Sequence, residues 1–110
     1  MSKRTQPELI ADIAEAIRRI ERYTANSTYE KFLNDTKVQD AVVRNLEIMG
    51  EAVKKLDSDF KKKHTHIEWK RIAGLRDRVI HDYFGVNWDI VWDVIRHKLP
   101  KVKAELQGIE

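Results

Sequence analysis

The sequence contains no cysteine, which excludes disulfide bonds, thiolate metal sites and cysteine nucleophiles. Glycine and proline are also scarce, with four and two residues in a chain of 110. No apolar stretch approaches the length of a membrane-spanning helix, and none follows the basic residues near the N-terminus, so we expect neither membrane insertion nor secretion. The lack of cysteine suits a reducing compartment, and we expect a cytoplasmic protein.

What the sequence does contain favours a helical protein. Hydrophobic residues make up 42% and charged residues 35% of the chain, a balance typical of a soluble helical bundle rather than of disorder or a β-sandwich. The length suits one compact core but not two ordinary domains, so we expect residues 1–110 to form a single domain. The formal net charge of +3 permits nucleic-acid binding without requiring it.

Helical spacing of apolar residues begins close to the N-terminus. Thr5 and Glu8 have the spacing of a capping box, and Pro7 falls in the first turn, where a helix loses no backbone donor. The periodicity fades at residues 25–28. We therefore expect a first helix after Thr5 and then one short turn at residues 29–33.

The next apolar stripe predicts a helix that Asp35 caps and that continues to Leu56. Asn45 is the polar member of this stripe, and we expect it to be buried and bonded to neighbouring backbone. Gly50 costs about 1 kcal/mol relative to alanine inside a helix, so another backbone should approach it closely. Residues 57–65 are polar and basic, and we expect a connecting segment there.

The C-terminal half carries two further helical stripes. One extends over residues 68–84, and Gly74 divides it into a short and a longer helix. Gly85 is placed to end this helix in a left-handed conformation, and Asn87 is placed to cap the last helix, which Pro100 should kink. The sequence thus predicts an all-α up-and-down bundle of four or five helices without strands. The tryptophans, at helical spacing, should belong to its core or to an oligomer interface.

One group of residues in the 68–84 segment could carry chemistry. Arg76 stands in the stripe where an apolar residue is expected, and His81 and Tyr83 follow it. On a regular helix Arg76 and His81 are separated by ~140°, so a second chain would be needed to bring them together. Tyr83 would share the face of Arg76, and Asp77, one turn before His81, could orient the histidine ring.

Arginine and histidine suffice for RNA cleavage without a metal ion. A guanidinium binds phosphate through two parallel hydrogen bonds and stabilises charge at phosphorus, and a histidine moves protons near neutral pH. DNA lacks the 2′-hydroxyl that serves as the internal nucleophile. The spacing alone is weak evidence, because one Arg and one His occur by chance in many helices.

Two long stretches, residues 38–52 and 67–86, resemble the HepT family in order and spacing, and residues 21–24 and 91–93 are similar as well. Arg76 and His81 match the family's catalytic positions. The resemblance implies a HEPN bundle of four or five helices that dimerises, or forms a higher homo-oligomer, and places two Arg-His pairs in a shared cleft. It implies cleavage of RNA, either tRNA or mRNA, with no metal ion or other cofactor.

The same resemblance implies a partner and a means of regulation. The family is the toxin half of a toxin-antitoxin pair, and its partner is an MntA-type minimal nucleotidyltransferase that transfers AMP to the motif tyrosine, here Tyr83. Such a modification would place phosphate charge and bulk beside Arg76 and would compete with RNA for the same groove.

Other residues have less specific roles. Lys70, Arg71 and Arg78 are candidate contacts for RNA phosphates, although basic surfaces are more often only solvated. Asn45 and Asp77 are candidates to support the catalytic pair. Two further functions remain open: a non-catalytic helical subunit that binds nucleotide or RNA within a nucleotidyltransferase complex, and a structural dimerisation adaptor.

Overall fold

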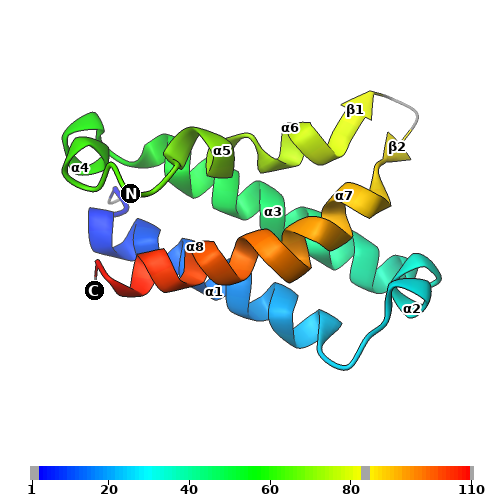
Figure 1. Cartoon of the computed structure of the whole chain (residues 1–110). Coiled ribbons are helices and arrows are strands. Elements are labelled where there is room, and N and C mark those ends of the chain that lie inside the picture. Colours follow the sequence, from blue (N-terminus) through cyan, green and yellow to red (C-terminus); the bar gives the residue numbers. More distant parts are fainter. Residues whose placement is uncertain (1–2, 83–84, 110) are drawn as a thin grey trace.

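The computed structural model describes residues 3–82 and 85–109, with the backbone alone for residues 80–82. Four long helical segments pass up and down beside one another (Figure 1). They are α1 (Gln6–Thr24), α3 (Thr36–Lys55), the pair α5 (Trp69–Ala73) and α6 (Leu75–Val79), and a last segment formed by α7 (Trp88–Asp93), η1 (Val94–Lys98) and α8 (Leu99–Gln107). The predicted all-α bundle is confirmed in this arrangement.

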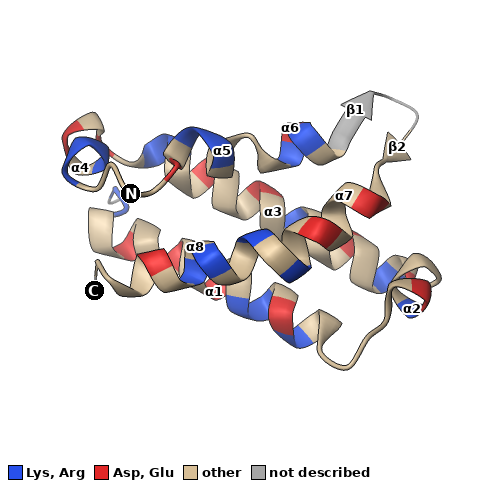
Figure 2. Ribbon diagram, in the orientation of Figure 1, with Lys and Arg blue, Asp and Glu red and all other residues tan. Residues whose placement is uncertain are grey.

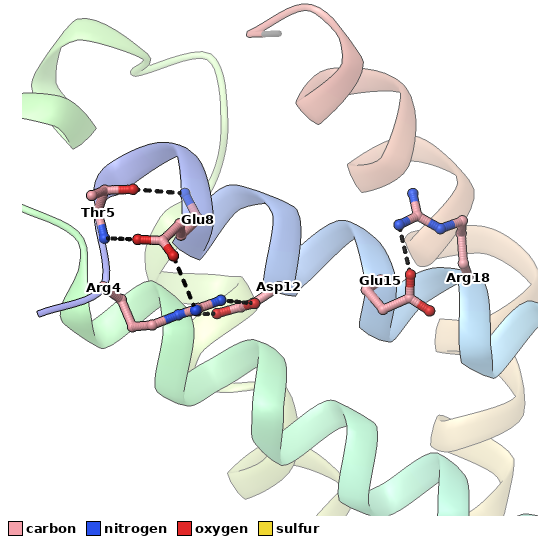
Figure 3. Close-up of polar contacts among 6 residues, drawn as sticks. All are labelled: Arg4, Thr5, Glu8, Asp12, Glu15 and Arg18. Atoms are coloured by element: carbon pink, nitrogen blue, oxygen red, sulfur yellow. Dashed lines mark hydrogen bonds and ion pairs between the residues drawn. The ribbon is translucent and has the colours of Figure 1, made fainter. Parts of the chain in front are cut away.

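Helix α1 begins with the predicted capping box (Figure 3). The Glu8 backbone N–H donates to Thr5 Oγ1 at 3.2 Å, and the Thr5 backbone N–H donates to Glu8 Oε1 at 2.9 Å. These bonds satisfy two donors that the first turn of a helix leaves free. The backbone bond from Thr5, followed by its side-chain bond and the nearby Arg4, lowers the pKa of Glu8 below its ordinary value.

The next part of the chain contains two short helices that flank α3. Helix α2 (Tyr29–Leu33) lies where a short turn was expected, and Asp35 Oδ1 caps α3 by accepting from the Val38 N–H at 3.1 Å. The prediction of a connecting segment at residues 57–65 was wrong, because Ser58–Lys63 forms helix α4. The Phe60 ring of α4 packs against Trp69 at a centroid distance of 6.3 Å, a tertiary contact that helical periodicity does not reveal.

A helix was predicted to continue to residue 84, but helix α6 ends at Val79. Gly74 divides α5 from α6 as expected, but Ile80–Asp82 forms strand β1, which pairs antiparallel with β2 (Gly85–Val86). In a continuing helix the Val79 carbonyl would accept from the backbone four residues ahead. It accepts instead from the Asn87 N–H at 2.8 Å, so pairing with the returning chain replaces the helical bond.

The β1–β2 ribbon also corrects two other predictions. Strands were not expected, and Gly85 was expected to end a helix in a left-handed conformation. Gly85 does have a positive φ of 134°, but it lies in β2, where this conformation accompanies the irregular register of the ribbon. The predicted cap at Asn87 is confirmed, because its Oδ1 accepts from the Ile90 N–H at 3.2 Å.

The last long helix is irregular next to its proline. Pro100 lies in the first turn of α8, and the preceding residues Val94–Lys98 form a π-helical turn. A proline cannot donate a backbone bond and its ring crowds the carbonyl four residues before it, here that of Arg96. The irregularity therefore falls just ahead of the proline that was expected to kink this helix.

Apolar side chains from all four long segments form one buried cluster. Phe32 of α2 is fully buried and contacts the rings of Trp88 and Trp92 at centroid distances of 5.6 and 5.2 Å. Trp69 is 8% exposed, and its indole N–H donates to the backbone carbonyl of His64. Of the two alternatives predicted for the tryptophans, the core is confirmed for Trp69, and Trp88 and Trp92 are partly buried against it. Within the described residues, no helix has the length and apolar character needed to cross a membrane.

Close packing between α3 and α5 explains the glycine inside α3. A Cβ atom built on Gly50 would lie 3.0 Å from the Ala73 carbonyl oxygen, which confirms the expected backbone approach. Ala73 is the last residue of α5, and Arg76 lies three residues beyond it. The absence of a side chain at Gly50 thus sets the distance between α3 and the segment that carries Arg76.

Gly50→Val should lower the free energy of unfolding by about 2 kcal/mol, because its side chain would meet backbone that cannot rotate away. Urea unfolding followed by circular dichroism measures the change. Valine has a higher helix propensity than glycine, so a loss of stability at Gly50 comes from packing. Arg44→Val places the same side chain at an exposed position of this helix and serves as the control. Equal losses in the two variants would contradict the packing explanation.

Candidate functional site

Arg76 lies on α6, beside the buried stripe and not within it. Its side chain is 48% exposed, whereas Leu75 and Val79 are 6% and 0% exposed. The prediction that Arg76 takes an apolar position was therefore wrong, because Leu75 fills that position in the stripe. Since the guanidinium is in contact with water, it needs no buried counterion to remain charged.

Arg76 borders a groove between α3 and the α5–α6 segment. The lining residues are Glu47, Gly50, Glu51, Lys54, Ala73, Arg76 and Asp77. Arg76 Nη1 lies 3.4 Å from Asp77 Oδ1, and Arg76 Nε lies 4.0 Å from Glu47 Oε2. Exposed ion pairs at these distances contribute little stability, so the guanidinium can turn toward another anion at small cost.

His81 lies in β1, five residues after Arg76. The angle of ~140° expected between them on a continuous helix does not apply, because α6 ends at Val79. For the same reason, helical spacing does not place Asp77 one turn before His81, and that geometric argument was wrong. The prediction that Arg76 and Tyr83 share one face of a helix involves Tyr83, which lies outside the described residues.

Asn45 is buried in α3, with 4% exposure. Its Nδ2 donates to the Ala41 carbonyl at 2.8 Å, which confirms the prediction of a buried residue bonded to neighbouring backbone. Its Oδ1 has no hydrogen-bond partner among the described residues. A role for Asn45 in supporting the catalytic pair stays a prediction.

The candidate RNA contacts Lys70, Arg71 and Arg78 are all exposed. Arg71 Nε lies 2.9 Å from Glu68 Oε2, whereas Arg78 has no carboxylate within 4.0 Å among the residues that the structure describes. Figure 2 shows basic residues on α4, α5 and α6 at one side of the bundle. Among the side chains that the structure describes, which do not include those of residues 80–84, no three His, Asp or Glu come close enough together to hold a metal ion.

Sequence reasoning missed a second groove, on the other side of α5–α6. Its walls come from α5–α6 and from η1–α8, and His97, Lys98 and Lys101 belong to the second wall. The signal was present in the sequence: these three residues recur at helical spacing between the core residues Ile95, Leu99 and Val102. A polar face opposite an apolar stripe is typical of any solvated helix, so this spacing alone does not predict a groove.

The comparisons with known proteins agree with one another. The family model described as "Ribonuclease HepT-like" matches residues 13–109. A relative in Thermococcus cleftensis, named "Probable ribonuclease HepT", is 43% identical over 107 residues, which cover 97% of each chain. Two relatives in Methanocaldococcus jannaschii, named provisionally as RNases, are each 42% identical over 109 residues, covering 99% of this chain and 90% of theirs. No solved structure is significantly similar.

Proposed function

The chain belongs to the HepT-like ribonuclease family, and from this membership we propose that it is a metal-independent endoribonuclease, the toxin of a toxin-antitoxin pair. The observation that carries the proposal is the position of Arg76. Its guanidinium is half exposed at the edge of a groove, and its ion pairs with described residues are long. An exposed and weakly paired guanidinium can bind a phosphate through two parallel N–H donors.

Arg76 and His81 would divide the chemistry between them. The 2′-oxygen of the RNA attacks the adjacent phosphorus, the bond to the 5′-oxygen breaks, and the products are a 2′,3′-cyclic phosphate and a 5′-hydroxyl. His81 would take the 2′-hydroxyl proton or return one to the leaving oxygen. Arg76 would bind the two non-bridging oxygens, where negative charge increases in the transition state.

The active unit is a dimer in this proposal, with the Arg76 of one chain and the His81 of the other meeting in a shared cleft. Family membership supports this arrangement. Asp77, next to Arg76 and 3.4 Å from its guanidinium, would hold the arginine in position when RNA is absent. Asn45 would support the same region from α3.

RNA cleavage in the presence of a chelator tests the proposal. Purified protein, shown by intact mass to carry no AMP on Tyr83, is incubated in EDTA with an RNA and with a DNA of the same sequence. We expect cleavage of the RNA alone, with cyclic phosphate ends, because only RNA has the internal nucleophile. RNA that is bound but never cleaved would favour a non-catalytic subunit of a nucleotidyltransferase complex.

We expect an MntA-type nucleotidyltransferase antitoxin to neutralise the protein by adding AMP to Tyr83. Co-expression of the two proteins should give a mass gain equal to one AMP group or more, and Tyr83→Phe should prevent it. Tyr23→Phe is the matched control, since Tyr23 is an exposed tyrosine on α1. A mass gain that survives in Tyr83→Phe and disappears in Tyr23→Phe would contradict the proposed site.

A further inference from the structure

The two sides of the α5–α6 segment differ in charge. On the side of Arg76, the groove against α3 contains three carboxylates and two cations, from Glu47, Glu51 and Asp77 and from Lys54 and Arg76. On the other side, the groove against η1–α8 contains four permanent cations and two carboxylates. The cations are Arg71, Arg78, Lys98 and Lys101, and the carboxylates are Glu68 and Glu105.

The cations of the second groove are exposed on both of its walls. Arg71 and Arg78 come from α5–α6, and Lys98 and Lys101 come from η1–α8. Of these four, only Arg71 has a carboxylate within 4.0 Å among the described residues. Figure 2 shows that basic residues occur along η1–α8 as well as on α5 and α6. Two facing rows of cations match a chain of phosphates better than a single anion.

This groove lies close to Arg76 but on the opposite flank of the same helix. Arg76 and Arg78 are two positions apart, so they are separated by ~200° around the axis of α6. The two flanks are therefore about one helix diameter apart, ~10 Å. The α3 side has one more carboxylate than cations, whereas the η1–α8 side has two more cations than carboxylates. The nucleotides next to a phosphodiester at Arg76 would therefore be attracted to the η1–α8 side rather than to the α3 side.

We propose that the groove between α5–α6 and η1–α8 is an extended RNA-binding surface, which holds single-stranded nucleotides that flank the phosphodiester cleaved at Arg76. The proposal rests on the ribonuclease function proposed above. Lys98 and Lys101 contact the phosphates from one wall, and Arg71 and Arg78 contact them from the other. His97, on the wall of η1, is placed to contact a ribose or base at the same level.

The local structure of η1 fits a binding role. Its π-helical turn ends at Lys98, just before Leu99 and Pro100, so the irregular backbone contributes His97 and Lys98 to the groove. Single π-helical turns within α-helices occur frequently at functional sites. Leu99 of the same segment is fully buried, which anchors this wall in the core while the basic side chains face solvent.

Binding of a fluorescein-labelled single-stranded RNA tests the proposal. The double variant Lys98→Gln/Lys101→Gln is measured in an Arg76→Ala background, in which cleavage should be too slow to affect the binding measurement. The dissociation constant should rise about tenfold, and the slope of log affinity against log salt should fall by about 1.4, since each single-strand phosphate contact contributes about 0.7. Lys31→Gln/Lys37→Gln removes the same charge from exposed positions of α2 and α3 and should change neither value.

With Arg76 intact, the Lys98→Gln/Lys101→Gln variant should show a raised KM and an unchanged kcat. If the variant binds RNA with unchanged affinity and cleaves it with an unchanged KM, the RNA-binding role of the groove is contradicted and the proposed ribonuclease function is not. If the variant binds RNA more weakly but the protein never cleaves RNA, the ribonuclease function is contradicted and the RNA-binding role of the groove is not. Loss of affinity for a co-expressed nucleotidyltransferase, with RNA binding intact, would show that the groove binds a protein and would also overturn the proposal.

Discussion

Arg76→Ala is expected to lower kcat for RNA cleavage by about 10²- to 10³-fold, the loss typical of one donor that stabilises transition-state charge. The guanidinium is half exposed and its two ion pairs are long, so its removal should change the free energy of unfolding by less than about 0.5 kcal/mol. A large loss of rate without a loss of stability separates a catalytic role from a structural one. Single-turnover cleavage in EDTA and thermal unfolding provide the two measurements.

Arg76→Lys makes the same test more specific. Lysine keeps the positive charge but loses the planar pair of donors, so we expect a rate between those of wild type and Arg76→Ala. Arg44→Ala removes an exposed arginine from α3 and should leave the rate unchanged. Cleavage by Arg76→Ala at the wild-type rate would show that the phosphate is held elsewhere and would contradict the proposed role.

The parts of the fold that the sequence predicted correctly depend on local rules. The caps at Thr5, Asp35 and Asn87 are set by a side chain and a backbone N–H within three residues. Gly50 was also predictable, because a glycine that weakens a helix needs a compensating close contact, here with Ala73. Such features need no knowledge of which segments meet in space.

The errors arose where contacts beyond a single helical turn determine the local structure. Helical periodicity continued past Val79, but the Val79 carbonyl bonds to Asn87 and the chain turns into the β1–β2 ribbon. Arg76 was placed in the buried stripe because its spacing fits, yet Leu75 lies in the core and Arg76 at the surface. One residue of register changes which side chain faces solvent, and packing decides the register.

The break at Val79 changes the argument for a dimer. The angle around a continuous helix cannot separate Arg76 from His81, because α6 ends before His81. The shared cleft therefore depends on family membership and needs a direct test. A test that pairs two inactive chains can distinguish a site built within one chain from a site built between two.

Co-expression of Arg76→Ala and His81→Ala chains with different tags, followed by two affinity steps, isolates the mixed dimer. If each site takes its arginine from one chain and its histidine from the other, one of the two symmetric sites has both groups intact and the other has neither. The mixed dimer should then regain about half of the wild-type rate, a large gain over either parent.

A site made within one chain predicts the opposite result, because each chain of the mixed dimer lacks one group. Activity at the level of the two parent variants would contradict the shared cleft, and failure to recover any mixed dimer would contradict the dimer itself. Wild-type chains carrying the same two tags set the full rate. Because the parents differ from them only at Arg76 and His81, a restored rate can come only from groups on two different chains.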